Sequence, residues 1–186
     1  MTRDELEHII RASADITGQY EFVIVGSQSI LGPVPHPEDV FTVSMEADIY
    51  PRDAPELAEK IDGAIGEGSQ FHETYGYYAQ GVGPDTAILP ADWQTRVHRV
   101  QNANTNDRAA FCLDVLDLFL SKAAAGREKD RAFCMALLKY GYVKPANLLE
   151  LVPKMPLDAG SQRRLRATLQ RWVKALRDAG HEISDK

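Results

Sequence analysis

The chain has 186 residues, 44% of them hydrophobic, and a formal net charge of −6, so it can bury one sizeable core without requiring two full domains. No stretch approaches the roughly 18 consecutive apolar residues of a membrane span, and the N-terminus is charged where a signal peptide needs an apolar run. We therefore expect a cytoplasmic protein with no membrane partner. The 2 cysteines and 5 scattered histidines form neither a disulfide framework nor a zinc site.

The charge is unevenly distributed along the sequence. Residues 1–121 carry 7 basic and 20 acidic side chains, whereas residues 122–186 carry 14 basic and 7 acidic ones. A basic region of this kind serves a polyanionic partner, covers a solvated helix face, or docks on the acidic part of its own chain.

The first predicted elements are a helix and a short buried strand. Thr2 and Glu5 match a capping box, which predicts an amphipathic helix over residues 3–17 that ends near Gly18. The apolar run at residues 21–25 predicts a strand.

A turn, a loop and a second strand follow. A helix begins within residues 27–31, and prolines exclude regular structure from residues 32–39. Alternation predicts a strand over residues 41–50. Residues 53–56 resemble an N-cap box, which opens a helix that ends near Ile65.

The remaining sequence divides into a strand-rich and a helical part. Aromatic residues, glycines and alternation predict two or three antiparallel strands within residues 69–101. Helices are then predicted at 109–125, 128–140, 144–152 and 158–179. The expected fold is α+β, a mixed β-sheet flanked by helices in a core of residues 1–107, with an all-helical C-terminal part at residues 108–186.

The second strand carries two carboxylates two positions apart. Glu46 and Asp48 share one face of the predicted strand, roughly 7 Å apart, with Ser44 and Tyr50 beside them. Such a pair either lies on a solvated strand face or holds a hard cation, Mg²⁺ or Mn²⁺, together with substrate phosphates.

A Gly-Ser pair ends the first strand. Gly26 lets a ligand approach the backbone, and the turn into a helix directs free N–H groups at an anion, with hydroxyl groups from Ser27 and Ser29. An ordinary strand-to-helix turn with a serine N-cap gives the same pattern. Together with the carboxylates, the turn predicts a triphosphate presented to a bound metal.

These motifs resemble a known family. Gly26-Ser27 followed by Glu46-x-Asp48 is similar to the polymerase-β type of nucleotidyltransferase, whose members show Gly-Ser and then Asp-x-Asp. The segment SKAAAGREKD, residues 121–130, resembles small bacterial nucleotidyltransferase-like proteins related to the AbiEii and MenT toxins of toxin–antitoxin systems. The resemblance covers about residues 20–140.

The second segment also has a physical interpretation. Lys122 lies on an otherwise apolar helix, and Gly126 interrupts that helix, so Arg127 and Asp130 can fold back beside Lys122. The resemblance implies that Lys122 contacts phosphate, that Asp130 completes the polar site and that Arg127 supports it. A local ion-pair network between two helices is the alternative.

The resemblance implies a metal-dependent nucleotidyltransferase that moves a nucleotide from an NTP to an RNA, such as tRNA, or to a protein. Glu46, Asp48, Lys122 and Asp130 would be catalytic, while Gly26, Ser27, Ser29, Lys122 and Arg127 would bind the nucleotide. The family draws a third carboxylate from a later strand, but the candidate strand at residues 95–101 contains none.

Two further interpretations stay open. The chain is either one component of a toxin–antitoxin system, with an antitoxin or another partner protein, or a catalytically degenerate module of the same fold that binds a nucleotide or a partner protein.

Overall fold

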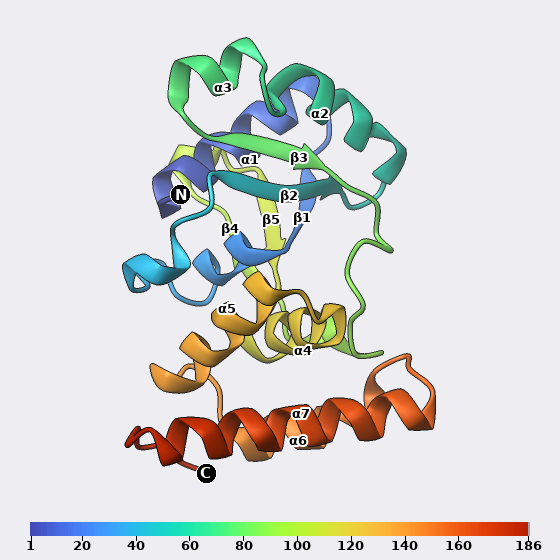
Figure 1. Ribbon diagram of the computed structural model, residues 1–186. Coiled ribbons are helices and arrows are strands. Elements are labelled where there is room, and N and C mark those ends of the chain that lie inside the picture. The colour runs from blue at the N-terminus through green and yellow to red at the C-terminus, as the bar shows by residue number, and fades with distance from the viewer. Residues whose placement is uncertain (186) are drawn as a thin grey trace. The chain divides into compact units, whose positions relative to one another are not determined.

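The computed structural model describes residues 1–185 and divides the chain into two compact units (Figure 1). The first unit, called the sheet unit, consists of Met1–Ala87 and Arg96–Asp114. The second, called the helical unit, consists of Ile88–Thr95 and the chain from Val115 onward. Each unit is described by itself.

The sheet unit is built on a five-stranded mixed sheet in the order β3-β2-β1-β5-β4. The strands are β1 (Glu21–Val25), β2 (Glu46–Pro51), β3 (Tyr78–Gly81), β4 (His98–Val100) and β5 (Ala109–Cys112). The central strand β1 pairs antiparallel with β2 and parallel with β5. β3 is parallel to β2, and β4 is antiparallel to β5. The predicted α+β class with a mixed sheet is confirmed.

Helices complete the sheet unit. They are α1 (Arg3–Thr17), α2 (Ala58–Ile65) and α3 (Gln70–Tyr75), with 3₁₀ turns η1 (Ser27–Leu31), η2 (Asp39–Phe41), η3 (Pro55–Leu57) and η5 (Ala103–Thr105). The capping box that Thr2 and Glu5 predicted at the start of α1 is present in full. The helix ends at Gly18, as predicted, and this glycine has the left-handed conformation.

The central strands of the sheet are buried on both faces. Ile24, Ile49 and Cys112 are paired across β2, β1 and β5, and all three are fully buried. Gly32, at the end of η1, lies so close that an added Cβ would stand 2.3 Å from the Cβ of Cys112. Asp48 pairs with Val25 and therefore belongs to the opposite face.

Several predicted elements are corrected. Residues 109–112 form β5 and not the start of a helix, because a short apolar run fits a buried strand as well as a helix. Residues 69–101 contain α3, where Ser69 caps the helix, and the strands β3 and β4 lie at opposite edges of the sheet.

The strand predicted at residues 41–50 begins only at Glu46, after η2 and a loop in which Val43 and Met45 are exposed. The expected N-cap box at residues 53–56 is also wrong. Pro55 opens a 3₁₀ turn that leads into α2, and no side-chain cap is present there.

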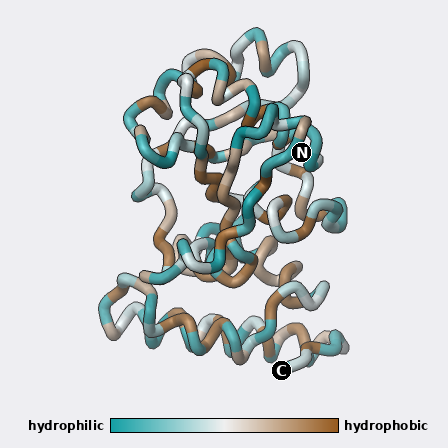
Figure 2. Tube along the Cα trace, turned by 180° about the vertical axis from the view of Figure 1, so that it is seen from behind, coloured by the Kyte–Doolittle hydropathy of each residue, from teal (hydrophilic) through white to brown (hydrophobic). Residues whose placement is uncertain are grey.

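The helical unit contains α4 (Val115–Ala125), α5 (Glu128–Lys139), α6 (Pro145–Leu151) and α7 (Ala159–Asp178), with the 3₁₀ turns η4 (Trp93–Thr95) and η6 (Val152–Lys154). Apolar and polar segments alternate along α7 (Figure 2). The buried residues of this helix are Leu165, Leu169, Val173 and Leu176. Within residues 1–185, no helix combines the length and the apolar character needed to cross a membrane.

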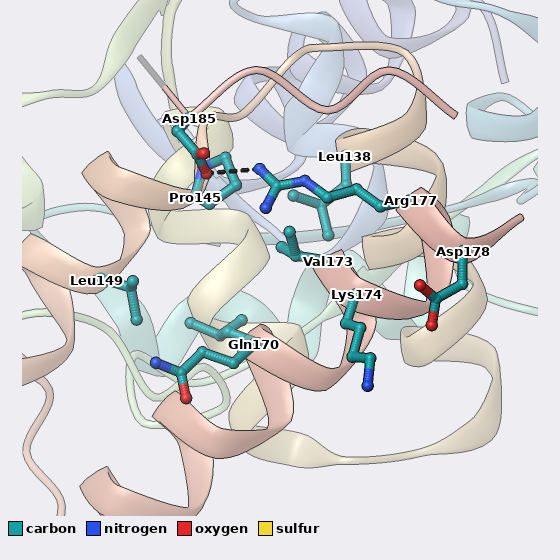
Figure 3. Close-up of a pocket in the computed structure, with 10 residues that line it drawn as sticks. Leu138, Pro145, Leu149, Gln170, Val173, Lys174, Arg177, Asp178 and Asp185 are labelled. Carbon is teal, nitrogen blue, oxygen red and sulfur yellow. Dashed lines mark hydrogen bonds and ion pairs between the residues drawn. The ribbon is translucent and has the colours of Figure 1, made fainter. Parts of the chain in front are cut away.

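A hollow of about 310 Å³ lies among α5, α6 and α7. Figure 3 shows its apolar wall, with Leu138 and Val173, and the ion pair between Arg177 and Asp185, whose N–O distance is 2.7 Å. Arg177 also donates a hydrogen bond to the carbonyl of Ile183. Ile183 and Asp185 are thereby held against the end of α7.

Candidate functional site

The strand directions bring the predicted motifs of the sheet unit to one end of the sheet. β1 ends at Val25, and the antiparallel β2 begins at the same end with Glu46. The parallel pairing of β3 with β2 and of β5 with β1 places Tyr78 and Cys112 there too. The predicted meeting of the Gly-Ser turn with the carboxylate strand is thus built into the sheet.

Asp48 lies directly against the backbone of Gly26. A Cβ added to Gly26 would stand 2.0 Å from Oδ2 and 2.9 Å from Cγ of Asp48. Gly26 also has φ +66° and ψ −166°, a backbone conformation that is essentially restricted to glycine. Both facts require glycine where β1 turns into η1, and the space that a side chain would fill is taken by the carboxylate.

Glu46 shares the strand face of Asp48, because the two residues are two positions apart on β2. The hydroxyl of Tyr78 donates a hydrogen bond of 3.3 Å to Oε2 of Glu46. Burial, followed by the negative charges of Glu46 and Glu67, raises the pKa of Tyr78 to about 12, so this phenol stays a donor at neutral pH.

The carboxylates of Glu46 and Asp48 are both partly exposed. Hard divalent cations such as Mg²⁺ take oxygen ligands and are commonly held by one or two carboxylates together with substrate phosphates. Two carboxylates on one strand face, beside a glycine backbone, fit that ligand chemistry.

The two serines of the turn have different surroundings. The hydroxyl of Ser29 is buried and donates to the carbonyl of Gly26 at 2.8 Å, so it stabilises the turn. The side chain of Ser27 is partly exposed, and its hydroxyl makes no hydrogen bond within residues 1–185. Ser27 is therefore the serine that can offer its hydroxyl to a ligand.

Gln28 was not singled out from the sequence, but it positions the strand that carries the carboxylates. Its side-chain amide is buried and donates to the carbonyls of Phe41 and Ser44, each at 3.4 Å. This ties the loop ahead of β2 to η1. Only the structure shows this role, because an isolated glutamine after Gly-Ser has no distinctive pattern.

Lys122, Arg127 and Asp130 belong to the helical unit and come together as predicted. Nζ of Lys122 lies 3.1 Å from Oδ1 of Asp130, and Nε of Arg127 lies 2.7 Å from Oδ2. Gly126, with φ +68°, separates α4 from α5 and permits this return. The Asp130 carboxylate is fully buried, and each of its oxygens faces one of the two cations.

The network also fixes the charge of Asp130. Burial by itself would raise the pKa of this carboxyl, but the hydrogen bonds from Arg127 and Lys122 outweigh it and hold the pKa below its ordinary value. Nζ of Lys122 additionally lies 4.7 Å from the centre of the Phe133 ring. The three charged groups therefore form a tight local ion-pair network within the helical unit.

A further acidic residue, Asp114, follows β5, the neighbour of β1. Its Oδ2 lies 2.9 Å from Nε2 of His98. His98 pairs with Cys112, which places it on the face of Ile24 and Cys112, opposite to the face of Asp48. The apolar run at residues 109–113, which is followed by Asp114, could have indicated a strand that ends in an acidic residue. The sequence analysis assigned this run to a helix.

The acidic side chains described above thus fall into three separate groups. Glu46 and Asp48 share a face of β2 beside Gly26, Asp114 pairs with His98, and Asp130 belongs to the other unit. Across residues 1–185, no group of three or more His, Cys, Asp or Glu side chains is arranged to hold a metal ion. A cation held by Glu46 and Asp48 would complete its coordination with further oxygen atoms, such as those of substrate phosphates or water.

A comparison with protein families identifies the family of the chain. Residues 4–177 match the family described as a nucleotidyltransferase of unknown function (DUF6036). The chain belongs to this nucleotidyltransferase family. Searches of curated proteins and of solved structures found no match. The resemblance of residues 121–130 to the AbiEii and MenT toxins stays a prediction.

Membership in the nucleotidyltransferase family covers both units, because the match extends from α1 almost to the end of α7. The polymerase-β-like motif predicted from Gly26-Ser27 and Glu46-x-Asp48 therefore lies within a matched nucleotidyltransferase. The roles of the individual residues are taken up as proposals.

Proposed function

We propose that the chain transfers a nucleotide from an NTP to a hydroxyl group of an RNA, such as tRNA, or of a protein, with Mg²⁺ or Mn²⁺ as its metal. The observation that supports this most directly is the seat of the Asp48 carboxylate against the backbone of Gly26. It brings the turn proposed to hold the triphosphate and the side chain proposed to hold the metal to one point, as transfer from a triphosphate requires.

Glu46 and Asp48 would hold the divalent cation. When bound, the cation neutralises charge on the transferred phosphate and lowers the pKa of the attacking hydroxyl. Tyr78 keeps Glu46 oriented through its hydrogen bond to Oε2. Because the Tyr78 pKa is raised to about 12, that orientation persists across the pH range in which such enzymes work.

Gly26 and Ser27 would hold the leaving phosphates. Gly26 lets the Asp48 carboxylate lie directly beside the turn, and the free hydroxyl of Ser27 can donate to a phosphate oxygen. In the transfer, the acceptor oxygen bonds to the α-phosphorus, the bond to the β-phosphate oxygen breaks, and pyrophosphate leaves.

We propose that Lys122 and Asp130 position the side chain of Arg127. Both Asp130 oxygens are engaged by the two cations, so this carboxylate is not available as a further metal ligand. Arg127, with a 63% exposed side chain, is the member that can reach a ligand.

The test is transfer of label from each α-³²P-labelled NTP to total cellular RNA and protein, with and without Mg²⁺. We expect metal-dependent labelling by the natural chain and at least a 100-fold loss in Asp48→Asn, in line with loss of a metal-binding group. The control is Asp53→Asn, an exposed acidic residue just beyond β2. Equal labelling by Asp48→Asn and Asp53→Asn would refute the proposal.

One observation favours a second function, a degenerate module that binds a nucleotide or a partner protein without turnover. The described residues contain no three-residue metal group, and Glu46 stands where the family pattern has aspartate. Such a module would bind NTP in an equilibrium assay, Asp48→Asn would weaken the binding, and no acceptor would become labelled. The same labelling experiment separates the two functions.

A further inference from the structure

The helical unit contains a second hollow, and apart from Arg127 the proposed transfer assigns no role to the residues that line it. It has a volume of about 510 Å³ and is lined by three arginines, one tryptophan, one threonine and one glutamate, namely Arg127, Arg131, Arg171, Trp172, Thr168 and Glu128. All of these residues belong to the helical unit. We call it the arginine–tryptophan pocket.

Two helices place the side chains on facing walls. Arg127 is the N-cap residue of α5 and Arg131 lies in its first turn, and both line the pocket. Thr168, Arg171 and Trp172 have spacings of three and four residues along α7 and therefore share a side of that helix. The start of α5 and one side of α7 thus direct the cations and the indole into the same space.

Two of the arginines are held in place by contacts within the unit. Nε of Arg127 donates to the buried Asp130 at 2.7 Å, which fixes the guanidinium although its side chain is 63% exposed. Arg171 donates to the Thr168 hydroxyl at 2.9 Å. Less side-chain entropy is lost on binding when donors are already positioned.

The indole of Trp172 is also anchored. Its ring meets the fully buried Phe119 in an edge arrangement, with 6.1 Å between ring centres. Trp172 itself is half-buried and lines the pocket. A rigid, partly exposed aromatic ring beside cations provides a surface on which a base can stack.

The charge balance of the pocket favours an anion. Three guanidinium groups face one carboxylate, that of Glu128, and the negative charge of Asp130 is already matched by Lys122. Guanidinium groups suit phosphate oxygens because their planar N–H groups can donate in pairs. A volume of about 510 Å³ lies within the size range of small-molecule sites.

We propose that the arginine–tryptophan pocket is a nucleotide site separate from the Gly26–Asp48 turn, with phosphate on the arginines and the base on Trp172. An aromatic ring next to an arginine cluster recognises both parts of a nucleotide, whereas inorganic phosphate would use the arginines alone. The same chemistry is offered by a free nucleotide and by a nucleotide within an RNA strand, and the experiment separates these sources.

The experiment measures the fluorescence of Trp172. The full chain carries Trp93→Phe, which leaves Trp172 as its single tryptophan. It also carries Asp48→Ala, and the buffer contains EDTA, so that the proposed metal site is removed. ATP, a 12-nucleotide single-stranded RNA and pyrophosphate are titrated separately. We expect saturable quenching by ATP or by the RNA, with a Kd at least tenfold lower than that of pyrophosphate, because stacking adds to the phosphate contacts.

Variants then test the residues. Arg131→Ala and Arg171→Ala should each weaken binding about tenfold, the effect of one lost charge-assisted hydrogen bond. The control is Arg163→Ala, an exposed arginine of α7 outside the pocket, which should change the Kd less than twofold. Circular dichroism of each variant checks that the helices remain folded.

The outcomes are distinct. Tight binding of ATP identifies a free nucleotide as the source, and binding of the RNA alone identifies a strand. The proposal is overturned by quenching that is absent, by pyrophosphate binding as tightly as the nucleotides, or by equal effects of Arg131→Ala and Arg163→Ala. Because the titration is done without the proposed metal site, its failure is separate from failure of the labelling test.

Discussion

Replacing Gly26 with alanine is the sharpest test of the turn that ends β1. The new Cβ would stand 2.0 Å from Oδ2 of Asp48, well inside the 3.5–4.0 Å of ordinary contact. The carboxylate must therefore move by roughly 1 Å or more, and a displacement of that size in a catalytic site costs about 100-fold in rate. The backbone conformation, φ +66° and ψ −166°, adds about 2 kcal/mol of strain.

Two assays follow from these magnitudes. We expect Gly26→Ala to lower Tm by about 4–8 °C for a chain of this length and to lower NTP transfer about 100-fold. Gly18→Ala is the matched control, because Gly18 also has positive φ, +68°, but an added Cβ would meet nothing within 4 Å. The control should lose about 1–2 kcal/mol and keep its transfer rate.

A double-mutant cycle separates strain from crowding. In an Asp48→Ala background the carboxylate is absent, so Gly26→Ala should cost only the backbone strain. The extra cost in the natural background measures the crowding between Gly26 and Asp48. If Gly26→Ala keeps both its Tm and its transfer rate, or if the two backgrounds give the same cost, Asp48 does not occupy the space beside Gly26.

Further predictions concern buried groups. Asp130→Ala leaves the Lys122 cation buried without its partner, and urea denaturation should show a loss of about 3–5 kcal/mol; a loss below 1 kcal/mol would contradict the network. Because the pKa of Asp130 is lowered, its ion pairs contribute fully to the free energy of unfolding above about pH 4. This contribution disappears as the pH falls through the lowered pKa, and Asp130→Ala should lack that pH dependence. Burial raises the thiol pKa of Cys112 to about 12 and raises that of Cys134, so Ellman's reagent at pH 8 should label neither thiol until urea is added; labelling of the native chain would contradict it.

The fold could be predicted where a local pattern had one meaning. The capping box at Thr2 and Glu5 and the stop at Gly18 fixed α1, since each satisfies backbone groups by itself. β5 could not be predicted in this way. Strands buried on both faces are continuously apolar, and only Leu113 and Asp114 separate its four residues from the apolar start of α4.

The candidate site could be predicted in part for the same reason. The adjacency of Gly26 and Asp48 followed from two neighbouring strands in the sequence, and the antiparallel pairing of Val25 with Asp48 confirms it. The pairing of Asp114 with His98 could not be found, because it depends on β4 and β5 lying side by side. Long-range pairing of short strands has no local signal.

The position of β5 in the sheet has a consequence for synthesis on the ribosome. β1 is complete at Val25, but its parallel partner emerges only with Ala109–Cys112, after α2, α3 and the excursion into the other unit. Until then one edge of the central strand exposes unpaired amide and carbonyl groups, which are open to pairing with other nascent chains. The sheet is therefore completed late in synthesis, when β5 pairs with the exposed edge of β1.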